Sequence, residues 1–500
     1  MSSSEPGQPP QVLARGEPSA ETRAPEGFFG TLEISEPKRI LIFFGCAALS
    51  FGLAWLAASS TDIEPAAARA LFILLFAATL WVTEAIPGFA VSILVIALQI
   101  RLLGDTGGVF AETTQDWEHF VAVIGHPLVW LFFGGFVLAA GMSHTGVDRR
   151  LAARVLTRLG DRPSMVLLGV MAITFVLSMF VSNTATTAMM LAILVPLLTS
   201  LDADDPYATS LVLGVAVAAN LGGMGSLIGS PPNAIAVGVL ARHEGGAQIS
   251  FLEWIVLGLP LALVLAGAAW LAISRLYPSR RPRLVFEGFS SAESEHEGPH
   301  APLWQGLVVG ATLALTVGLW LTSQWHGVPT AAVSFIPIVA FTSTGIFGAR
   351  EMRNLSWDVL FLLAGGLALG QMVAETGLSG WLVARLPSEG LGQAGIALVM
   401  AYATVVLSNF MSNTAAANIL IPIGVTMATS FAGHIALPIA LAASAAMCLP
   451  IATPPNAMVY ATGRCQTRDF IRLGIPLGLV TPALAVLWIT LVLRWADAIG

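Results

Sequence analysis

The chain has 500 residues, of which 56% are hydrophobic and only 11% are charged, and its formal net charge is −7. A soluble protein carries about 25% charged residues, so this chain lacks the charged side chains that a water-facing surface of its size requires. The composition excludes a soluble enzyme, a nucleic-acid-binding protein and a disulfide scaffold. It predicts a polytopic integral membrane protein.

Two polar segments interrupt the apolar sequence. Residues 1–36 are rich in Ser, Pro, Gly and Glu, which predicts a disordered cytoplasmic tail. The tail has no apolar core and is therefore not a signal peptide. Residues 38–66 hold the first predicted transmembrane helix. Residues 279–302 are predicted to be a cytoplasmic linker between two membrane halves.

Apolar runs of membrane-spanning length follow one another along the rest of the chain. They are 40–59, 68–86, 88–103, 127–147, 164–199, 207–240, 251–276, 303–324, 329–347, 357–384, 393–430, 436–461 and 470–495. The runs 164–199 and 393–430 are too long for one helix and are interrupted at the middle, so we interpret each as a re-entrant hairpin. The predicted fold is an all-α polytopic membrane protein with about 11 transmembrane helices and two re-entrant hairpins.

The distribution of basic residues predicts the orientation. With the N-terminus in the cytoplasm, 18 of the 23 Lys and Arg residues fall in cytoplasmic segments and 5 on the opposite side. Cytoplasmic loops of membrane proteins carry such an excess of positive charge. We therefore expect an integral protein of the plasma (inner) membrane with a cytoplasmic N-terminus.

The two halves of the chain repeat the same polar motifs in the same order. Ser182-Asn183-Thr184 recurs as Ser412-Asn413-Thr414, and Pro231-Pro232-Asn233 recurs as Pro454-Pro455-Asn456. A Gly-Gly pair precedes the first motif in each half. Ordered matches at nearly constant spacing indicate an internal repeat.

The repeats are predicted to be inverted. The first spans residues 67–278 with the hairpin 164–199, and the second spans residues 303–495 with the hairpin 393–430. Each holds five predicted crossings, and because five is odd the second copy must be upside down relative to the first. Inverted repeats with broken helices at the membrane midplane are a common plan of secondary transporters.

The repeated motifs bring polar groups to membrane depth. Ser-Asn-Thr between apolar stretches fits a hairpin tip, where Ser and Asn satisfy the free groups of helix ends. Two consecutive prolines cannot continue a helix, so the runs 207–240 and 436–461 should unwind at Pro-Pro-Asn. Carbonyl and hydroxyl oxygens suit Na⁺, whereas N–H groups, hydroxyls and the Asn amide suit a carboxylate or oxyanion.

No Lys or Arg is predicted near these motifs at membrane depth. A bound anion then has no basic side chain as a partner, and a buried unpaired charge is prohibitive. Helix N-termini supply only about half a charge each. A divalent anion must therefore travel with at least two Na⁺ ions, and a third would make transport electrogenic.

Other polar residues in the runs receive a different interpretation. Glu84 and Asp358 lie near span ends, where interfacial or capping positions are expected. Ser226 and Ser230 superficially suggest a serine nucleophile, but no His at membrane depth is placed to act as its base. We therefore predict that the protein is not an enzyme.

These motifs, together with Trp81-Val82-Thr83-Glu84-Ala85-Ile86-Pro87, resemble the divalent anion:sodium symporter family, which carries dicarboxylates, citrate or sulfate. The resemblance covers about residues 38–495. It implies a homodimer in which a mobile transport domain moves like an elevator against a fixed scaffold.

It also implies specific site residues. The sodium sites map onto Ser178, Ser182, Asn183 and Gly229, and onto Ser408, Ser412, Asn413 and Ala452. The substrate site maps onto Asn183, Thr184, Ser230, Pro231, Asn413, Thr414, Thr453 and Pro454.

The leading hypothesis is sodium-coupled symport of a small divalent anion, a C4 dicarboxylate such as succinate, malate or fumarate. An anion exchanger or a proton-coupled carrier on the same scaffold is the alternative. Citrate and sulfate remain alternative substrates, because the sequence does not determine which anion is carried. A channel fits less well, because two closed polar tips at the midplane suit alternating access.

Overall fold

The computed structural model describes residues 36–104, 117–156, 158, 160–202, 205–242, 248–284, 302–385, 392–427 and 431–499. The predicted tail up to residue 35 and residues 285–301 of the predicted linker lie outside this part of the chain. The described residues form helices and connecting turns, with no strand among them.

The helices follow the predicted apolar runs closely. In the first half they are α1 (Glu36–Ser60), α2 (Pro65–Thr83), α3 (Gly88–Gln99), η1 (Ile100–Gly104), α4 (Glu118–Val121), η2 (Ala122–Gly125), α5 (Pro127–Thr145), α6 (Val147–Leu156), α7 (Pro163–Ser178), α8 (Asn183–Ser200), α9 (Pro206–Met224), α10 (Pro231–Arg242) and α11 (Phe251–Leu276). In the second half they are α12 (Leu303–Leu321), α13 (Ser323–His326), α14 (Thr330–Val333), α15 (Phe335–Ser343), α16 (Ala349–Arg353), α17 (Trp357–Glu375), α18 (Leu378–Val383), α19 (Gln393–Ser408), α20 (Asn413–Thr426), α21 (Gly433–Ala443), α22 (Pro454–Ala461) and α23 (Thr467–Ile499).

Nine helices of the described residues are long and apolar enough to cross a membrane, and five shorter apolar helices accompany them. Their surfaces also carry many exposed large apolar side chains, such as Leu41, Phe44 and Trp55 on α1. Apolar side chains that face outward along a long helix are stable in contact with lipid. The predicted all-α polytopic class is therefore confirmed, while the count of about 11 crossings stays a prediction.

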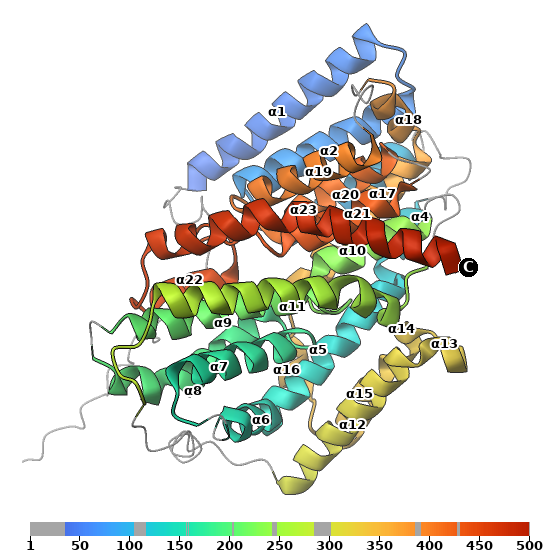
Figure 1. Cartoon of the computed structure of the whole chain (residues 1–500). Helices are drawn as coiled ribbons and strands as arrows, with labels where there is room; N and C mark the ends of the chain where they lie inside the picture. The colour runs from blue at the N-terminus through green and yellow to red at the C-terminus, as the bar shows by residue number, and fades with distance from the viewer. Residues whose placement is uncertain are drawn as a thin grey trace, which may run out of the picture.

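The two longest runs are broken at the Ser-Asn-Thr motifs. The first run divides into α7, which ends at Ser178, and α8, which begins at Asn183. The second divides into α19, which ends at Ser408, and α20, which begins at Asn413. In both places four residues separate two helices that pack against each other, as α7 and α8 do in Figure 1. These four-residue segments are called the first and second tips below.

Each tip ends in the same helix cap. The hydroxyl oxygen of Ser182 accepts a hydrogen bond from the backbone N–H of Ala185 at 3.2 Å. The hydroxyl oxygen of Ser412 accepts one from Ala415 at 3.1 Å. A serine at this position satisfies one of the free N–H groups that open a helix. The serine of each motif therefore ends the turn and starts the next helix.

The Pro-Pro-Asn motifs also interrupt their runs, as predicted. α9 ends at Met224 and α10 begins at Pro231, while α21 ends at Ala443 and α22 begins at Pro454. Residues 225–230 and 444–453 are called the first and second breaks below. A proline at the first position of a helix lacks only an N–H that would have no partner there. Each pair of prolines thus ends an unwound segment and opens a short helix.

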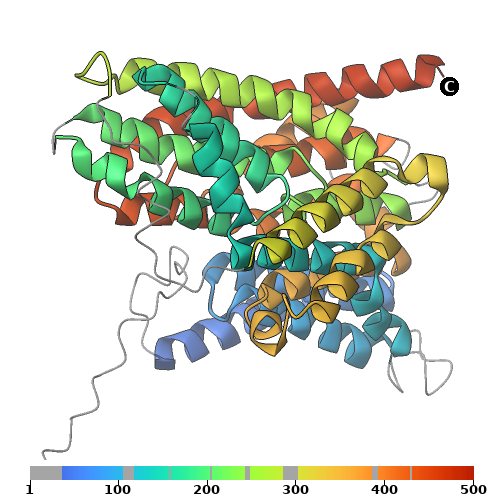
Figure 2. The ribbon, with the colours of Figure 1, turned by 90° about the horizontal axis from the view of Figure 1, so that it is seen from below.

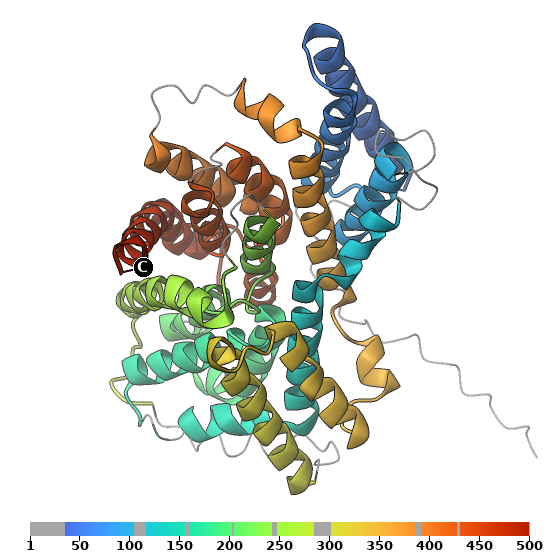
Figure 3. The same cartoon turned by 90° about the vertical axis from the view of Figure 1, so that its right-hand side faces the viewer.

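The two halves interlock around these interruptions. α10 of the first half packs against α20 and α21, and α22 of the second half packs against α8 and α9. α17 contacts α2 and α3 on one side and α10 and α20 on the other. Figure 3 shows this division, and Figure 2 shows α11 and α23 along one edge with α1 and α2 along the opposite edge. α17 therefore lies between the broken helices and the N-terminal helices.

The Gly-Gly pair of α17 permits this position. A Cβ on Gly365 would lie 2.3 Å from the Cβ of Ser92 in α3, and one on Gly366 would lie 1.8 Å from Oδ1 of Asn418 in α20. Both distances are far below van der Waals contact. Two adjacent glycines therefore let one helix approach a neighbour on each side.

Replacing Gly365 with alanine should destabilise the protein by about 1–3 kcal/mol, because the added methyl group overpacks the contact between α17 and α3. Gly310→Ala is the matched control, since a Cβ there meets no atom within 4 Å. Thermal unfolding of the purified variants in detergent gives the unfolding temperature of each. Equal unfolding temperatures for the two variants would contradict the tight packing described here.

Candidate functional site

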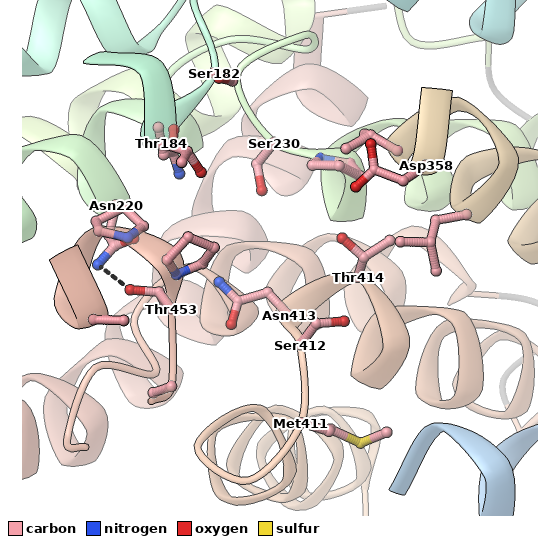
Figure 4. A pocket seen from close by; sticks show the side chains of 18 of the residues that line it. Ser182, Thr184, Asn220, Ser230, Asp358, Met411, Ser412, Asn413, Thr414 and Thr453 are labelled. Carbon is pink, nitrogen blue, oxygen red and sulfur yellow. Dashed lines mark hydrogen bonds between the residues drawn. The ribbon is translucent and has the colours of Figure 1, made fainter. Parts of the chain in front are cut away.

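A cavity of about 300 Å³ lies where the two tips and the two breaks meet (Figure 4). Thr184 and Ser230 of the first half face Asn413 and Thr414 of the second half across it. Ligand pockets span about 300–1,000 Å³, so this cavity suits a small solute. Four motifs that are far apart in the sequence thus contribute to one wall.

The structure brings nearly all of the predicted site residues to this cavity. The eight residues predicted to bind substrate all line it: Asn183, Thr184, Ser230, Pro231, Asn413, Thr414, Thr453 and Pro454. Of the residues predicted for sodium, Ser182, Gly229, Ser412 and Ala452 also line it. Ser178 and Ser408 are fully buried and do not reach the cavity surface. The clustering is a finding about geometry, and the individual roles stay predictions.

Three oxygen atoms converge beside the first tip. Oγ of Ser178 lies 2.6 Å from Oδ1 of Asn183 and 2.8 Å from the backbone oxygen of Ala219. A hydroxyl carries one hydrogen, so Ser178 donates to only one of these two acceptors at a time. Oxygen atoms in this arrangement are the ligands that a hard cation prefers.

The helix ends on either side of the second tip hold buried oxygens without a partner among the described residues. Neither Oγ of Ser408 nor Oδ1 of Asn413 forms a hydrogen bond there, although both atoms are buried. A buried polar atom without a partner costs about 1–3 kcal/mol. These two oxygens are therefore available to a ligand, and their role in sodium binding stays a prediction.

The side chain of Asn233 holds the first break in its unwound shape. Nδ2 of Asn233 donates to the backbone oxygen of Gly223 at 2.9 Å and to that of Ser226 at 2.8 Å. The carbonyl of Gly223 stands at the end of α9, and the carbonyl of Ser226 also accepts from the N–H of Gly229 at 3.3 Å. Because unsatisfied backbone groups are costly at membrane depth, the amide of Asn233 stabilises the break directly.

The second break uses the corresponding asparagine. Nδ2 of Asn456 donates to the backbone oxygens of Met447 at 3.2 Å and Leu449 at 3.0 Å. The second tip is also hydrogen-bonded to the second break. The N–H of Cys448 donates to Oδ1 of Asn409 in the second tip at 2.8 Å. The asparagine of each Pro-Pro-Asn motif is therefore primarily a support for the backbone.

Ser226 has a comparable structural task. Its hydroxyl donates to the backbone oxygen of Met179 in the first tip and accepts from the N–H of Gly229 at 3.1 Å. The side chain is fully buried and does not line the cavity. Its hydrogen bonds match the interpretation of Ser226 as part of an unwound segment rather than as a nucleophile.

The sequence analysis missed several residues that line the cavity. Asn220 of α9 is 1% exposed and donates from Nδ2 to Oγ1 of Thr453 and to Oδ1 of Asn456 (Figure 4). The sequence did contain a signal for Asn220, because it is the only residue with a side-chain amide in the apolar sequence of α9. The cavity is also lined by Phe132, Phe136, Phe410 and Met411. Apolar residues of this kind have no signal that separates them from lipid-facing ones.

The charges at the cavity are all negative. No Lys, Arg or His lines it in the described part of the chain, whereas Glu84 and Asp358 do. Glu84 follows the last residue of α2, and Asp358 lies in the first turn of α17, where a negative charge is favourable. Both positions agree with the predicted span ends, but their place at the cavity was not expected. The acidic side chains of the wall therefore favour cations, while the helix N-termini around the cavity carry partial positive charge.

The chain matches a known family model over most of its length. The model of the citrate transporter family, CitMHS, matches residues 78–446. The sodium-dependent dicarboxylate transporter SdcS of Staphylococcus saprophyticus is 31% identical over 448 residues, which cover 83% of this chain and 84% of the relative. SdcS of Staphylococcus aureus (strain bovine RF122) is 30% identical over the same coverage. These relatives are carriers and not enzymes.

The fold is also similar to a solved structure. Neisseria gonorrhoeae MtrF, described as one of a class of antimetabolite efflux pumps, aligns with a TM-score of 0.52. The alignment covers 81% of this chain and 93% of that chain at 14% identity. At this identity the similarity concerns the fold alone.

Asn233→Ala should lower the stability of the protein by about 1–3 kcal/mol, because the carbonyl of Gly223 loses the donor from Asn233 and the carbonyl of Ser226 keeps only the N–H of Gly229 at 3.3 Å. Thr481→Val is the matched control, since the Thr481 hydroxyl is buried without a partner among the described residues and its loss leaves nothing unpaired. Unfolding temperatures in detergent compare the two. A control as unstable as Asn233→Ala would show that the asparagine does not support the break.

Proposed function

This chain belongs to the divalent anion:sodium symporter family, whose citrate transporter model it matches, and from that membership we propose that it carries a C4 dicarboxylate such as succinate together with Na⁺. The observation that carries the proposal is the convergence of both tips and both breaks on one small cavity without a basic side chain. Membrane transport is the established part. Substrate, coupling and mechanism are the proposal.

Donors for an anion come from the motifs that open helices. α8, α10, α20 and α22 all begin at residues that line the cavity, so four helix N-termini point toward one space. Their partial positive charges favour carboxylate oxygens. The first two residues of α8 and α20 also offer backbone N–H groups, whereas α10 and α22 each begin with two prolines, which have none. We assign the carboxylates to the residues that open the helices after the two tips and to the residues where each break meets its helix: Asn183, Thr184, Asn413, Thr414, Ser230, Pro231, Thr453 and Pro454.

Acceptors for cations lie beside the same tips. We assign one Na⁺ to the oxygens around Ser178, Ser182, Asn183 and Gly229, and a second to those around Ser408, Ser412, Asn413 and Ala452. The converging oxygens at Ser178 support the first site, and the unpartnered oxygens of Ser408 and Asn413 support the second. Sodium is cargo in this scheme and leaves with the substrate.

Electrostatics makes the two cargoes dependent on each other. The dianion meets no basic side chain at the cavity but two carboxylates, Glu84 and Asp358. Partial charges of helix ends do not neutralise two full negative charges in a medium of low dielectric constant. At least two Na⁺ ions must therefore accompany the substrate. A third makes each cycle electrogenic, with about 2.3 kcal/mol of driving force per charge per 100 mV.

The mechanism we propose is an elevator. The two tips and two breaks, with α7–α11 and α19–α23, form the moving unit that carries the cavity. α17 lies between this unit and α2 and α3, which belong to the proposed scaffold. In this proposal the two halves are inverted repeats with re-entrant hairpins, the N-terminus is cytoplasmic, and the scaffold forms a homodimer as in the family. The equal length of α5 and α17, 19 residues each, supports the repeat.

Proteoliposomes that contain the protein should take up labelled succinate only when an inward Na⁺ gradient is present. Replacement of external Na⁺ by choline should abolish uptake, because the dianion then enters an uncompensated negative cavity. Citrate, sulfate and tartrate tested as competitors measure the choice of anion. Counterflow of succinate in the complete absence of Na⁺ would reject symport and select an exchanger.

Ser408→Ala should raise the Na⁺ concentration for half-maximal succinate uptake about tenfold or more, because it removes one oxygen of the second sodium site. Thr404→Val is the matched control, since its hydroxyl lies in the same helix, is fully buried and bonds only to Met400 of that helix. Uptake measured at increasing Na⁺ and saturating succinate gives the Na⁺ concentration for half-maximal uptake of each variant. An unchanged Na⁺ requirement in Ser408→Ala would remove Ser408 from the site.

A further inference from the structure

The amide of Asn220 has a defined orientation, which follows from its neighbours. Asn456 directs one end of its own amide at the backbone oxygens of Met447 and Leu449, and only Nδ2 can donate to carbonyls. The other end of Asn456 is therefore Oδ1, an acceptor. It faces the amide of Asn220 at 3.2 Å, so the atom of Asn220 at this contact is Nδ2.

This orientation fixes the polarity of Thr453. The same Nδ2 of Asn220 lies 3.1 Å from Oγ1 of Thr453, and the backbone N–H of Asn456 donates to that Oγ1 at 3.3 Å. A threonine hydroxyl has two acceptor sites and one hydrogen to donate. Both acceptor sites are occupied, and Thr453 lines the cavity. What the hydroxyl can offer a ligand is its hydrogen.

The first break lacks this arrangement. At the 223-residue offset between the Pro-Pro-Asn motifs, Ala443 corresponds to Asn220 and has no polar side chain. Oδ1 of Asn233, the counterpart of Oδ1 of Asn456, is accordingly buried without a hydrogen bond within the described residues. The Ser230 hydroxyl, the counterpart of Thr453, receives no side-chain hydrogen bond in the same part of the chain. The two breaks are therefore chemically different although their motifs are alike.

We propose that Asn220 is a positioning residue that makes the Thr453 hydroxyl an obligate hydrogen-bond donor to a carboxylate of the transported anion. This inference rests on the proposed function and refines it, because it fixes the direction of the hydrogen bond between Thr453 and the substrate, names the residue that fixes it, and excludes the Thr453 oxygen as a sodium ligand. Asn220 belongs to the first half and Thr453 to the second, so the contact also ties the two halves together at the cavity.

A double-mutant cycle tests this assignment. Thr453→Val should raise the KM for succinate about 10- to 150-fold, the loss of one hydrogen bond to a charged group, while Thr453→Ser stays close to wild type. Asn220→Leu, which keeps the size but removes the donor, should raise KM about 2- to 12-fold. The double variant should lie within about twofold of Thr453→Val alone, because Asn220 acts only through the hydroxyl that is already absent.

Two results would overturn the inference while leaving the proposed function intact. If the KM increases of the single variants multiply in the double variant, Asn220 acts independently of Thr453. If Thr453→Val raises the Na⁺ requirement at saturating succinate as much as Ser408→Ala does, the Thr453 oxygen is a sodium ligand. The second test needs no Asn220 variant and therefore holds even if Asn220→Leu does not fold. Failure of the wild type to take up any anion of the panel removes both proposals, since no carboxylate then reaches Thr453.

Discussion

Unwound backbone at membrane depth must find hydrogen-bond partners inside the protein, and the architecture of this chain depends on that constraint. Two tips and two breaks expose carbonyl and N–H groups that a continuous helix would have paired. Serine caps at Ser182 and Ser412 satisfy the new helix starts, and the amides of Asn233 and Asn456 satisfy carbonyls of the breaks. Among the buried side-chain atoms without a partner in the described residues, Oδ1 of Asn413 belongs to a residue that lines the cavity. Internal hydrogen bonds thus hold the unwound segments in place around the space that a ligand can enter.

The absence of basic side chains at the cavity has a mechanistic consequence. An arginine would bind a carboxylate strongly in every state and would keep the substrate bound without its cation. Helix ends and hydroxyl groups bind weakly on their own, and the carboxylates of Glu84 and Asp358 oppose an anion that arrives without cations. In the proposed mechanism, affinity for the anion therefore exists only while Na⁺ is bound. Coupling would then follow from charge balance and would not require a separate gate for each ion.

The sequence predicts the helix interruptions well because their causes are local. Two prolines and a capping serine act within a few residues, so each break and tip appears where its motif stands. It also predicts most of the cavity wall, since the same motifs supply it. Asn220 escapes such reasoning because a single amide in an apolar helix has no local partner. Its partners are more than 200 residues away and become neighbours only after the two halves interlock. Glu84 and Asp358 were placed correctly along their helices, but helix ends alone do not reveal that both meet the cavity.

The repeated motifs supply two similar polar segments, and the chemical differences between them underlie the separate binding roles that we propose. The second break receives a donor from Asn220 that leaves Thr453 with only a hydrogen to offer, whereas the first break keeps a buried oxygen of Asn233 without a partner. A symmetric pair of sites would present the same groups to both ends of the substrate and to both cations. One amide, present in α9 and replaced by Ala443 in α21, is enough to remove that symmetry. The asymmetry is chemical and not topological, so the two halves can keep one fold while one break specialises in the anion.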